Sequence, residues 1–445
     1  MTSNNTSSLL IRGYKLVHFV VAISIFCFAW DKYVIANNIG MASRYNLFIY
    51  AFYTVLVFFL IRTYNAYLIE YTRIRHIAFA LCLSTTISTF IVYFTTLIAW
   101  NKSFSPKYFI LQSIIQIFIN VFWSWSASLI FRKTHKASKS IIIYRNKDDL
   151  GRLEGVKELF EKYDVVKYLE CPQLIDDVIA QIQGVETVFI TGVNATLRNG
   201  IVKYCAEKNL QCFFLPHVGD VILMSGEHVQ AFSVPLMSIT GSNIKLEDQV
   251  IKRTFDLIIS SFALIILSPI FIITAIAIKA NDGGSVFYKQ DRLTRGGKVF
   301  SIYKFRSMKE NAESDGIAVL SSGDDDDRIT KVGKVIRATR IDELPQLINI
   351  LKGDMSVVGP RPERPEIAAE YENNIPAFKL RLQVKAGLTG YAQVYGKYNT
   401  EPYDKLEMDL LYISRMSVLL DFQIMLATIP ILFRKESTEG FKGDK

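Results

Sequence analysis

The sequence predicts a membrane protein of mixed class, α plus α/β. It combines a four-helix transmembrane unit, a Rossmann-like α/β module and a mixed α/β C-terminal domain with a re-entrant membrane helix. Half of the 445 residues are hydrophobic, the mean hydropathy is +0.22, and the apolar excess lies mainly in the first third. Beyond it, short apolar runs alternate with helical patterns, which is typical of α/β structure. We place the domains at residues 1–137, 138–244 and 245–445.

Four apolar segments in the first 131 residues are close to the length that a bilayer requires. Their cores are Leu16–Trp30, Leu47–Ile61, Ile77–Trp100 and Tyr108–Phe131. A signal peptide is the alternative for the first segment, but no small-residue cleavage site follows Trp30 and further spans come after it. We therefore expect four transmembrane helices.

Basic residues gather beside these segments at two places. They are Arg62, Arg73, Arg75 and His76 between the second and third segments, and Arg132, Lys133, Lys136 and Lys139 after the fourth. The other loops carry fewer basic residues, and such residues are in excess on the cytoplasmic side of a membrane. Both ends of the four-helix unit should therefore face the cytoplasm.

The chain has a formal net charge of +9, which suits nucleic acid, an anionic lipid surface or phosphorylated substrates. No nucleic-acid-binding motif is present, so lipid and phosphate are the preferred interpretation and no nucleic-acid partner is expected. The cysteines show no metal-ligand spacing, and we expect reduced thiols. They are Cys27, Cys82, Cys171, Cys205 and Cys212.

The segment from about Ser138 to Thr240 predicts a small parallel α/β unit. Its apolar runs are Ile141–Tyr144, Val165–Leu169, Thr187–Ile190 and Cys212–Leu215, and its helical patterns are Leu150–Tyr163 and Leu174–Ile182. A dinucleotide site would require a glycine-rich turn after the first strand, but residues Arg145–Asp149 contain no glycine. A scaffold or regulatory role is the better interpretation.

The almost wholly apolar segment Phe255–Ile278 is long enough for a fifth span. A straight span would place everything after it outside the cell, and basic residues flank both of its ends. Ser268 and Pro269 interrupt the segment, and a proline inside a helix removes a hydrogen bond and bends the axis. We expect a helix that enters the membrane, breaks at Ser268-Pro269 and returns to the same face; a kinked true span is the alternative.

Two strand-like runs, Val286–Leu293 and Val299–Phe305, flank the glycine-containing turn Arg295–Lys298 and predict a β-hairpin. The second run ends in Lys304 and Arg306 on either side of an aromatic residue. Because strand side chains alternate, both cations should share one side, which would suit a diphosphate. A solvated strand face is the alternative.

Adjacent carboxylates, Asp342 and Glu343, lie at the start of a helical pattern from Ile341 to Leu351, with Thr339 or Asp342 as the expected N-cap. The positive end of a helix would favour an ionised carboxylate and a bound phosphoryl group. No His or Cys occurs from residue 252 to 445, so a carboxylate is the obvious nucleophile for any covalent chemistry in this domain.

Arginines accompany this carboxylate pair. Arg337 precedes it, and Arg361 lies in the stiff segment Gly359–Pro362, where two prolines fix φ angles. A carboxylate pair alone is ordinary at a helix start, but its combination with Lys304, Arg306, Arg337 and Arg361 is much more specific. The acidic run Asp324–Asp327 lacks the spacing of a calcium loop, and we expect a solvated loop there.

Several motifs of the C-terminal domain resemble the bacterial sugar transferases, the polyprenyl-phosphate hexose-1-phosphate transferases. The matching pieces are Lys252–Asp256, Tyr303–Met308, Arg328–Thr330, Asp342–Gln346, Leu351–Ser356 and Val358–Pro362. The resemblance runs from Gln249 to about Phe433, and the N-terminal spans with the α/β module resemble the large form of the family. The chain departs from it at Asp327, where proline is frequent, and at Tyr391–Lys397, which puts the sugar identity in doubt.

The resemblance implies a phosphoglycosyl transferase domain facing the cytoplasm at the bacterial cytoplasmic membrane. It would transfer a sugar 1-phosphate from a UDP-sugar to undecaprenyl phosphate, releasing UMP, as the first step of exopolysaccharide, capsule or related glycan assembly. Asp342 would form a phosphosugar-aspartyl intermediate, and Glu343 would bind Mg²⁺. The remaining candidates are Lys304, Arg306, Arg337 and Arg361 for substrate phosphates, and Lys252 and Arg253 for the lipid phosphate.

Two other functions stay open from the sequence, a polyprenyl-diphosphate phosphatase and a non-catalytic membrane scaffold of a polysaccharide complex. The absence of His from the domain argues against many phosphatase mechanisms, and the intact pair Asp342-Glu343 argues against a scaffold. A homo-oligomer is compatible with the sequence, which specifies neither the oligomeric state nor the sugar.

Overall fold

The computed structural model describes residues 2–37, 43–69, 72, 74–100, 105–134, 137–154, 163–171, 175–231, 234–239, 246–309, 328–396 and 400–432. Contacts divide the chain into two units, Met1–Leu215 and Pro216–Lys445. The acidic run Asp324–Asp327, which we expect to be a solvated loop, lies outside the described residues.

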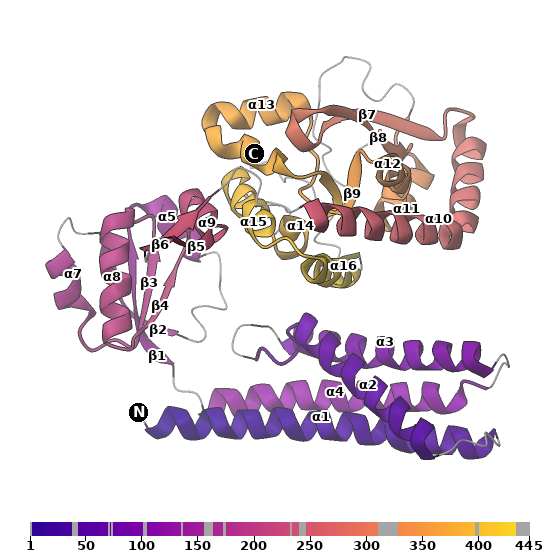
Figure 1. Cartoon of the computed structure of the whole chain (residues 1–445), viewed down its shortest axis with the longest axis horizontal. Helices are drawn as coiled ribbons and strands as arrows, with labels where there is room; N and C mark the ends of the chain where they lie inside the picture. Colours follow the sequence, from indigo (N-terminus) through magenta and orange to yellow (C-terminus); the bar gives the residue numbers. More distant parts are fainter. Residues whose placement is uncertain are drawn as a thin grey trace. The chain divides into compact units, whose positions relative to one another are not determined.

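The first unit begins with four long helices, which confirm the four predicted apolar segments. They are α1 (Thr2–Ala36), α2 (Ser43–Thr63), α3 (Ile74–Trp100) and α4 (Lys107–Thr134). Each is long and apolar enough to cross a membrane. Helix α4 packs against both α1 and α3, and α2 packs against α3 (Figure 1).

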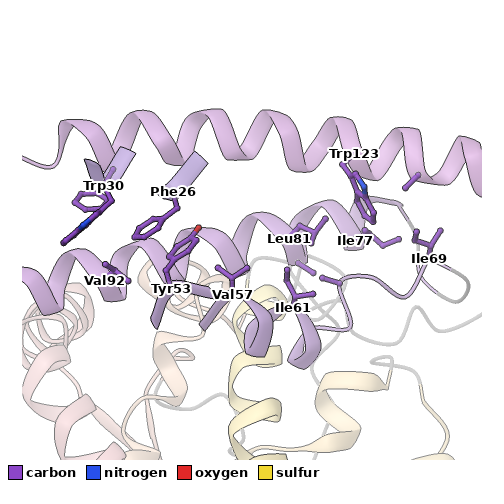
Figure 2. Packing of buried hydrophobic residues seen from close by; sticks show 14 of the residues in the cluster. Phe26, Trp30, Tyr53, Val57, Ile61, Ile69, Ile77, Leu81, Val92 and Trp123 are labelled. Atoms are coloured by element: carbon purple, nitrogen blue, oxygen red, sulfur yellow. The ribbon is translucent and has the colours of Figure 1, made fainter. Parts of the chain in front are cut away.

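The bundle core combines aromatic packing with buried amides. Figure 2 shows Phe26 and Tyr53 facing each other, and their rings stack with centroids 3.6 Å apart. Gln112, Gln116 and Asn120 recur every four residues along α4, so they lie on one helix face, and all three are buried. Asn120 Nδ2 donates to Thr85 Oγ1 of α3 at 3.1 Å. In hydrocarbon, such hydrogen bonds join helices to one another.

A four-stranded parallel sheet follows, with strand order β2-β1-β3-β4. Its elements are β1 (Ser138–Tyr144), α5 (Lys147–Glu154), β2 (Tyr163–Glu170), α7 (Ile175–Ile182), β3 (Thr187–Thr191), α8 (Ala195–Glu207) and β4 (Gln211–Phe214). Side chains of β1 alternate between two faces: Ile141 and Ile143 join the cluster formed with α7 and α8, whereas Ile142 packs with Leu153 of α5. The predicted α/β region with a parallel sheet is confirmed.

The second unit begins before the predicted third domain. Helix α9 (Val218–Met224) precedes the hairpin of β5 (Glu227–Ala231) and β6 (Val234–Ser238). Val221 of α9 is fully buried in one cluster with Phe378, Leu406 and Leu410. This short helix therefore contributes to the core of the C-terminal unit, although it lies within residues 138–244.

Helix α10 (Leu246–Asp282) is the fifth helix in the described part of the chain that is long and apolar enough to cross a membrane. Figure 1 shows it turning sharply along its length, and Pro269 lies inside it. Most of its apolar side chains are exposed, including Phe262 and Ile265. Re-entrance stays a prediction, because no membrane is part of the structure.

The rest of the second unit surrounds two small sheets. It comprises β7 (Phe287–Leu293), η1 (Arg295–Gly297), β8 (Val299–Phe305), α11 (Lys331–Ala338), η2 (Ile341–Glu343), α12 (Gln346–Lys352), β9 (Met355–Val358), α13 (Pro365–Asn374), η3 (Pro376–Gln383), β10 (Ala386–Thr389), α14 (Tyr391–Tyr395), α15 (Pro402–Ser414) and α16 (Val418–Leu432). Strands β7 and β8 form the predicted antiparallel hairpin, in which Gly296 and Gly297 have positive φ. Strands β9 and β10 pair in parallel.

The predicted helix from Ile341 to Leu351 is divided in two. A 3₁₀ turn covers Ile341–Glu343, and α12 begins only at Gln346, after Pro345. The expected N-cap at Thr339 or Asp342 is wrong: Thr339 is the C-cap of α11, and Asp342 lies within the 3₁₀ turn. A proline has no backbone N–H to donate and is tolerated at the start of a helix, which fits a new helix beginning at this point.

Candidate active site

Three cations lie around the carboxylate of Glu343 in the described part of the second unit. Arg361 Nη2 is 3.1 Å from Glu343 Oε1, and Lys304 Nζ is 3.7 Å from the same oxygen. Arg340 Nη1 is 3.9 Å from Oε2. The Glu343 side chain is only 15% exposed, so these attractions are screened less than in bulk water.

Different elements supply these groups. Lys304 belongs to β8, and Arg361 follows β9. Asn349 of α12 connects β8 to the helix that follows the carboxylates, because its Nδ2 donates to Ser301 O at 2.9 Å and its Oδ1 accepts from Tyr303 N–H at 2.9 Å. The position of Lys304 relative to Glu343 therefore depends on a buried amide.

Arg340 is a contact of Glu343 that the sequence-based site lacks. It has a φ of 54°, in the left-handed region that non-glycine residues seldom adopt. This conformation immediately precedes the 3₁₀ turn. The sequence offers one sign of this contact, because Arg340 precedes Glu343 by three residues. That spacing brings the two side chains together only if the residues between them form a helical turn.

The pKa of Asp342 is raised to about 6. Burial is the largest cause, and the charge of Glu343 acts in the same direction. Lys304, Arg337 and Arg361 oppose the rise, so all three lie within electrostatic reach of this carboxyl group. Asp342 thus titrates nearer to neutral pH than an ordinary aspartate.

The pKa of Glu343 moves in the opposite direction. Burial by itself would raise it, but the positive charges of Arg361, Lys304 and Arg340 together lower it to about 2. Neighbouring carboxyl groups whose pKa values are pushed apart can take different chemical roles. Near neutral pH, Glu343 is therefore the ionised member of the pair, and Asp342 is the member whose pKa lies closer to neutrality.

Arg306 has a different partner from Lys304. Its guanidinium pairs with Asp282, the last residue of α10, while the intervening Phe305 is buried against α10 and α11. The side chain of Arg306 is 7% exposed, and a Cβ on Gly284 would collide with it. The structure thus places Arg306 where α10 joins the hairpin; its predicted role with a diphosphate is untested.

Comparison with known proteins gives the family. The model of the bacterial sugar transferases matches residues 247–435. A UDP-glucose:undecaprenyl-phosphate glucose-1-phosphate transferase of Caulobacter vibrioides is 38% identical over 42% of this chain and 71% of its own length. The exopolysaccharide production protein ExoY of Sinorhizobium fredii is also 38% identical, over 40% of this chain and 84% of its own length. The chain belongs to the bacterial sugar transferase family.

Matches to longer members of this family cover only part of them. A UDP-N-acetylgalactosamine-undecaprenyl-phosphate N-acetylgalactosaminephosphotransferase of Aeromonas hydrophila is 43% identical, over 40% of this chain and 43% of the relative. A UDP-glucose:undecaprenyl-phosphate glucose-1-phosphate transferase of Klebsiella pneumoniae is 36% identical, over 52% of this chain and 50% of the relative. The chain thus spans about half the length of these two relatives or less.

Two candidates for the lipid phosphate in this family member already have protein partners. Lys252 Nζ lies 2.5 Å from Asp421 Oδ2 of α16. Arg253 donates to Ile350 O at 2.6 Å and to Leu351 O at 2.9 Å, so it binds carbonyls at the end of α12. Both contacts join α10 to the rest of the domain, and a role with lipid stays a prediction.

The predicted break of the membrane helix, Ser268-Pro269, lies inside α10. Ser268 Oγ donates to Ile265 O at 2.7 Å. Pro269 cannot donate a main-chain hydrogen bond to the preceding turn, so this point is where the helix bends most readily. The side chains around it are largely exposed, which suits an apolar environment.

No group of three or more His, Cys, Asp or Glu side chains forms a metal site among the residues that the structure describes. Mg²⁺ often binds through one or two carboxylates with substrate phosphates and water completing its shell. Glu343 fits that mode, because its low pKa keeps it ionised and its surroundings attract phosphate. The residues present are therefore compatible with a Mg²⁺ ion that arrives with substrate.

Proposed function

We propose that this protein transfers a sugar 1-phosphate from a UDP-sugar to undecaprenyl phosphate and releases UMP, as the initiating step of exopolysaccharide, capsule or related glycan assembly. The observation that carries the proposal is a pair of adjacent carboxyl groups whose pKa values are shifted in opposite directions. Cations surround this pair, and the chain belongs to the bacterial sugar transferase family. Relatives named for this transfer to undecaprenyl phosphate support the choice of acceptor.

Transfer would proceed in two displacements. An Asp342 oxygen attacks the phosphorus nearer the sugar, a new P–O bond forms, and the bond from that phosphorus to the oxygen of UMP breaks. An oxygen of the lipid phosphate then attacks the same phosphorus and displaces Asp342. One phosphoanhydride replaces another, so no oxidant, reductant or water is consumed.

Cations of the site would bind the phosphates during both steps. Lys304 and Arg361 already contact Glu343, and Arg337 acts on Asp342. Glu343 together with substrate oxygens would bind Mg²⁺, which, when bound, neutralises charge on the departing UMP. Arg306 would bind a substrate phosphate from its position between the end of α10 and the β7–β8 hairpin. Lys252 and Arg253 would bind the phosphate of the lipid acceptor.

Membrane placement follows from the apolar helices. We propose that α10 enters from the cytoplasm and returns to it, so that the catalytic domain faces cytoplasmic UDP-sugars. Supporting this placement, Lys252 and Lys279 flank the apolar part of the helix, and Pro269 lies between them. The carboxylates can then meet both a soluble nucleotide and a lipid acceptor.

A panel of UDP-sugars tested for UMP release in membranes containing undecaprenyl phosphate tests this function. We expect one sugar to support sustained UMP release over many turnovers that depends on both the lipid and Mg²⁺. Release of inorganic phosphate from a polyprenyl diphosphate instead would indicate a phosphatase. Absence of both products would favour a scaffold.

A further inference from the structure

The main chain that carries Arg361 is hydrogen-bonded on several sides. Gly387 N–H donates to Pro360 O at 2.9 Å, and Leu293 N–H donates to Glu363 O at 3.0 Å. The carbonyls of the two intervening residues, Arg361 and Pro362, accept hydrogen bonds from the side chains of buried or half-buried arginines. Arg381 Nη2 donates to Arg361 O at 2.9 Å, and Arg292 Nη1 donates to Pro362 O at 3.0 Å.

Asp409 of α15 fixes the orientation of the Arg381 side chain. Its Nε and Nη2 lie 2.9 Å and 2.7 Å from Asp409 Oδ2, and its Nη1 lies 3.4 Å from Glu363 Oε1. The side chains of Arg381 and Asp409 are 4% and 1% exposed. Phe378 lies under the guanidinium, 4.9 Å from ring centroid to Cζ. All three guanidinium nitrogens are therefore engaged in a fixed geometry.

Stability alone is a weak reason for this arrangement. Removing two charges from water is costly, and well-packed apolar side chains in place of a buried ion pair often leave a protein as stable as before. An apolar pair could not donate to Arg361 O, however. That carbonyl belongs to the same residue whose guanidinium lies 3.1 Å from Glu343 Oε1 and whose side chain is 46% exposed.

We infer that Arg381 and Asp409 are positioning residues for transfer: Arg381 holds Arg361 against Glu343 by donating to the main-chain carbonyl of Arg361, and Asp409 fixes the orientation of Arg381. The inference rests on the proposed function. Lysine cannot replace Arg381, because one ammonium lacks the fork that reaches Asp409 and the carbonyl together. A displacement of about 1 Å at a substrate-binding group can lower the rate about a hundredfold.

A double-mutant cycle in the full-length protein tests this inference. UMP release and UDP-sugar binding are measured for Arg381→Lys, Asp409→Asn and Arg361→Lys, and for each of the first two combined with Arg361→Lys. The control is Ile201→Ala, which removes a fully buried side chain from a core cluster of the first unit whose members include no residue of the C-terminal unit. If Arg381→Lys does not fold, Asp409→Asn, which keeps the shape of the side chain, decides the result.

We expect Arg381→Lys to lower kcat/KM for the UDP-sugar roughly a hundredfold in the Arg361 background and much less in the Arg361→Lys background. Ile201→Ala should have the same effect on kcat/KM in both backgrounds. The opposite outcome is that the effects of Arg381→Lys and Asp409→Asn on kcat/KM simply add to the effect of Arg361→Lys, as the effect of the control does. In that case both residues are merely structural and the inference is wrong. If the wild type releases no UMP at all, the proposed function fails and the inference falls with it.

Discussion

At the scale of single residues, two neighbours in the chain have become chemically different. Burial and the adjacent charge raise the pKa of Asp342 to about 6, whereas surrounding cations lower that of Glu343 to about 2. Of these two carboxyl groups, only Asp342 changes its charge near neutral pH. The reactive group and the group that binds cations are thereby distinguished by environment and not by residue type.

The pH dependence of transfer should report Asp342. An attacking carboxylate must be ionised, and its pKa is raised, so kcat/KM should fall as pH decreases through about 6. Because Arg337 lowers this pKa, Arg337→Gln should move the acidic limb to higher pH. Lys334→Gln, an exposed change on the same helix α11, should leave it in place. An unchanged limb in Arg337→Gln would show that another group controls the profile.

Replacing each carboxylate by its amide should separate their roles. Asp342→Asn should retain the fold and UDP-sugar binding but lose transfer by several orders of magnitude, since removal of a covalent nucleophile has losses of that size. Glu343→Gln should also be severely impaired, and additional Mg²⁺ should restore part of its activity. Near-normal turnover of Asp342→Asn in steady-state UMP release would contradict the assignment of the nucleophile.

Charged residues that belong to motifs were easier to predict than contacts that depend on a special backbone conformation or on the direction of a helix. Lys304, Glu343 and Arg361 were singled out by type and spacing, and they meet. Arg340 was missed because its contact depends on a positive φ. The partner of Arg306 was missed because Asp282 comes from the end of a helix whose direction the sequence does not specify.

At the scale of elements, α10 was predictable from the sequence, whereas the packing of α9 was not. Helix α10 was expected from its apolar length and its proline, and both are present. Helix α9 is too short for periodicity to reveal where it packs. Its partners on η3 and α15 lie far away in the chain, so its place in the C-terminal core emerges only from the structure.

Cysteine labelling should determine the topology of α10. Glu247→Cys and Asn281→Cys, in a background without the native cysteines, place exposed thiols near its two ends and leave the Lys252 and Arg306 ion pairs intact. Re-entrance predicts that both react only from the cytoplasm. Periplasmic reaction at position 281 alone would identify a true span, and Pro269→Leu should shift the helix toward that straight form.

Truncation should reveal the contribution of α9. A chain that starts at Pro216 retains Val221, whereas one that starts at Lys245 leaves Leu406 and Phe378 uncovered. Burying a valine contributes about 1.5–3 kcal/mol, so the melting temperature of the shorter chain should be lower by about 3–12 °C. Both should transfer sugar phosphate in lipid. Equal melting temperatures would show that α9 adds nothing to this core.

At the scale of the whole molecule, apolar helices long enough to cross a membrane, a parallel α/β sheet and a domain of the bacterial sugar transferase family occur in one chain. Hydropathy was sufficient to predict the four N-terminal helices, because apolar length is a local property. The split of the expected Ile341–Leu351 helix was not predicted, since the 3₁₀ turn depends on the left-handed Arg340 before it. The role of the α/β sheet is a question for activity measurements on the truncated chains.

The most direct test of the central claim is to trap the covalent intermediate. Wild-type protein is mixed with a UDP-sugar labelled in the phosphate nearer the sugar, with Mg²⁺ and without a lipid acceptor, and is then digested and sequenced. We predict one label per active site on the peptide containing Asp342, its absence in Asp342→Asn, and its loss from the wild type when undecaprenyl phosphate is added. UMP release that requires both substrates together, with no label on the protein, would contradict the double displacement.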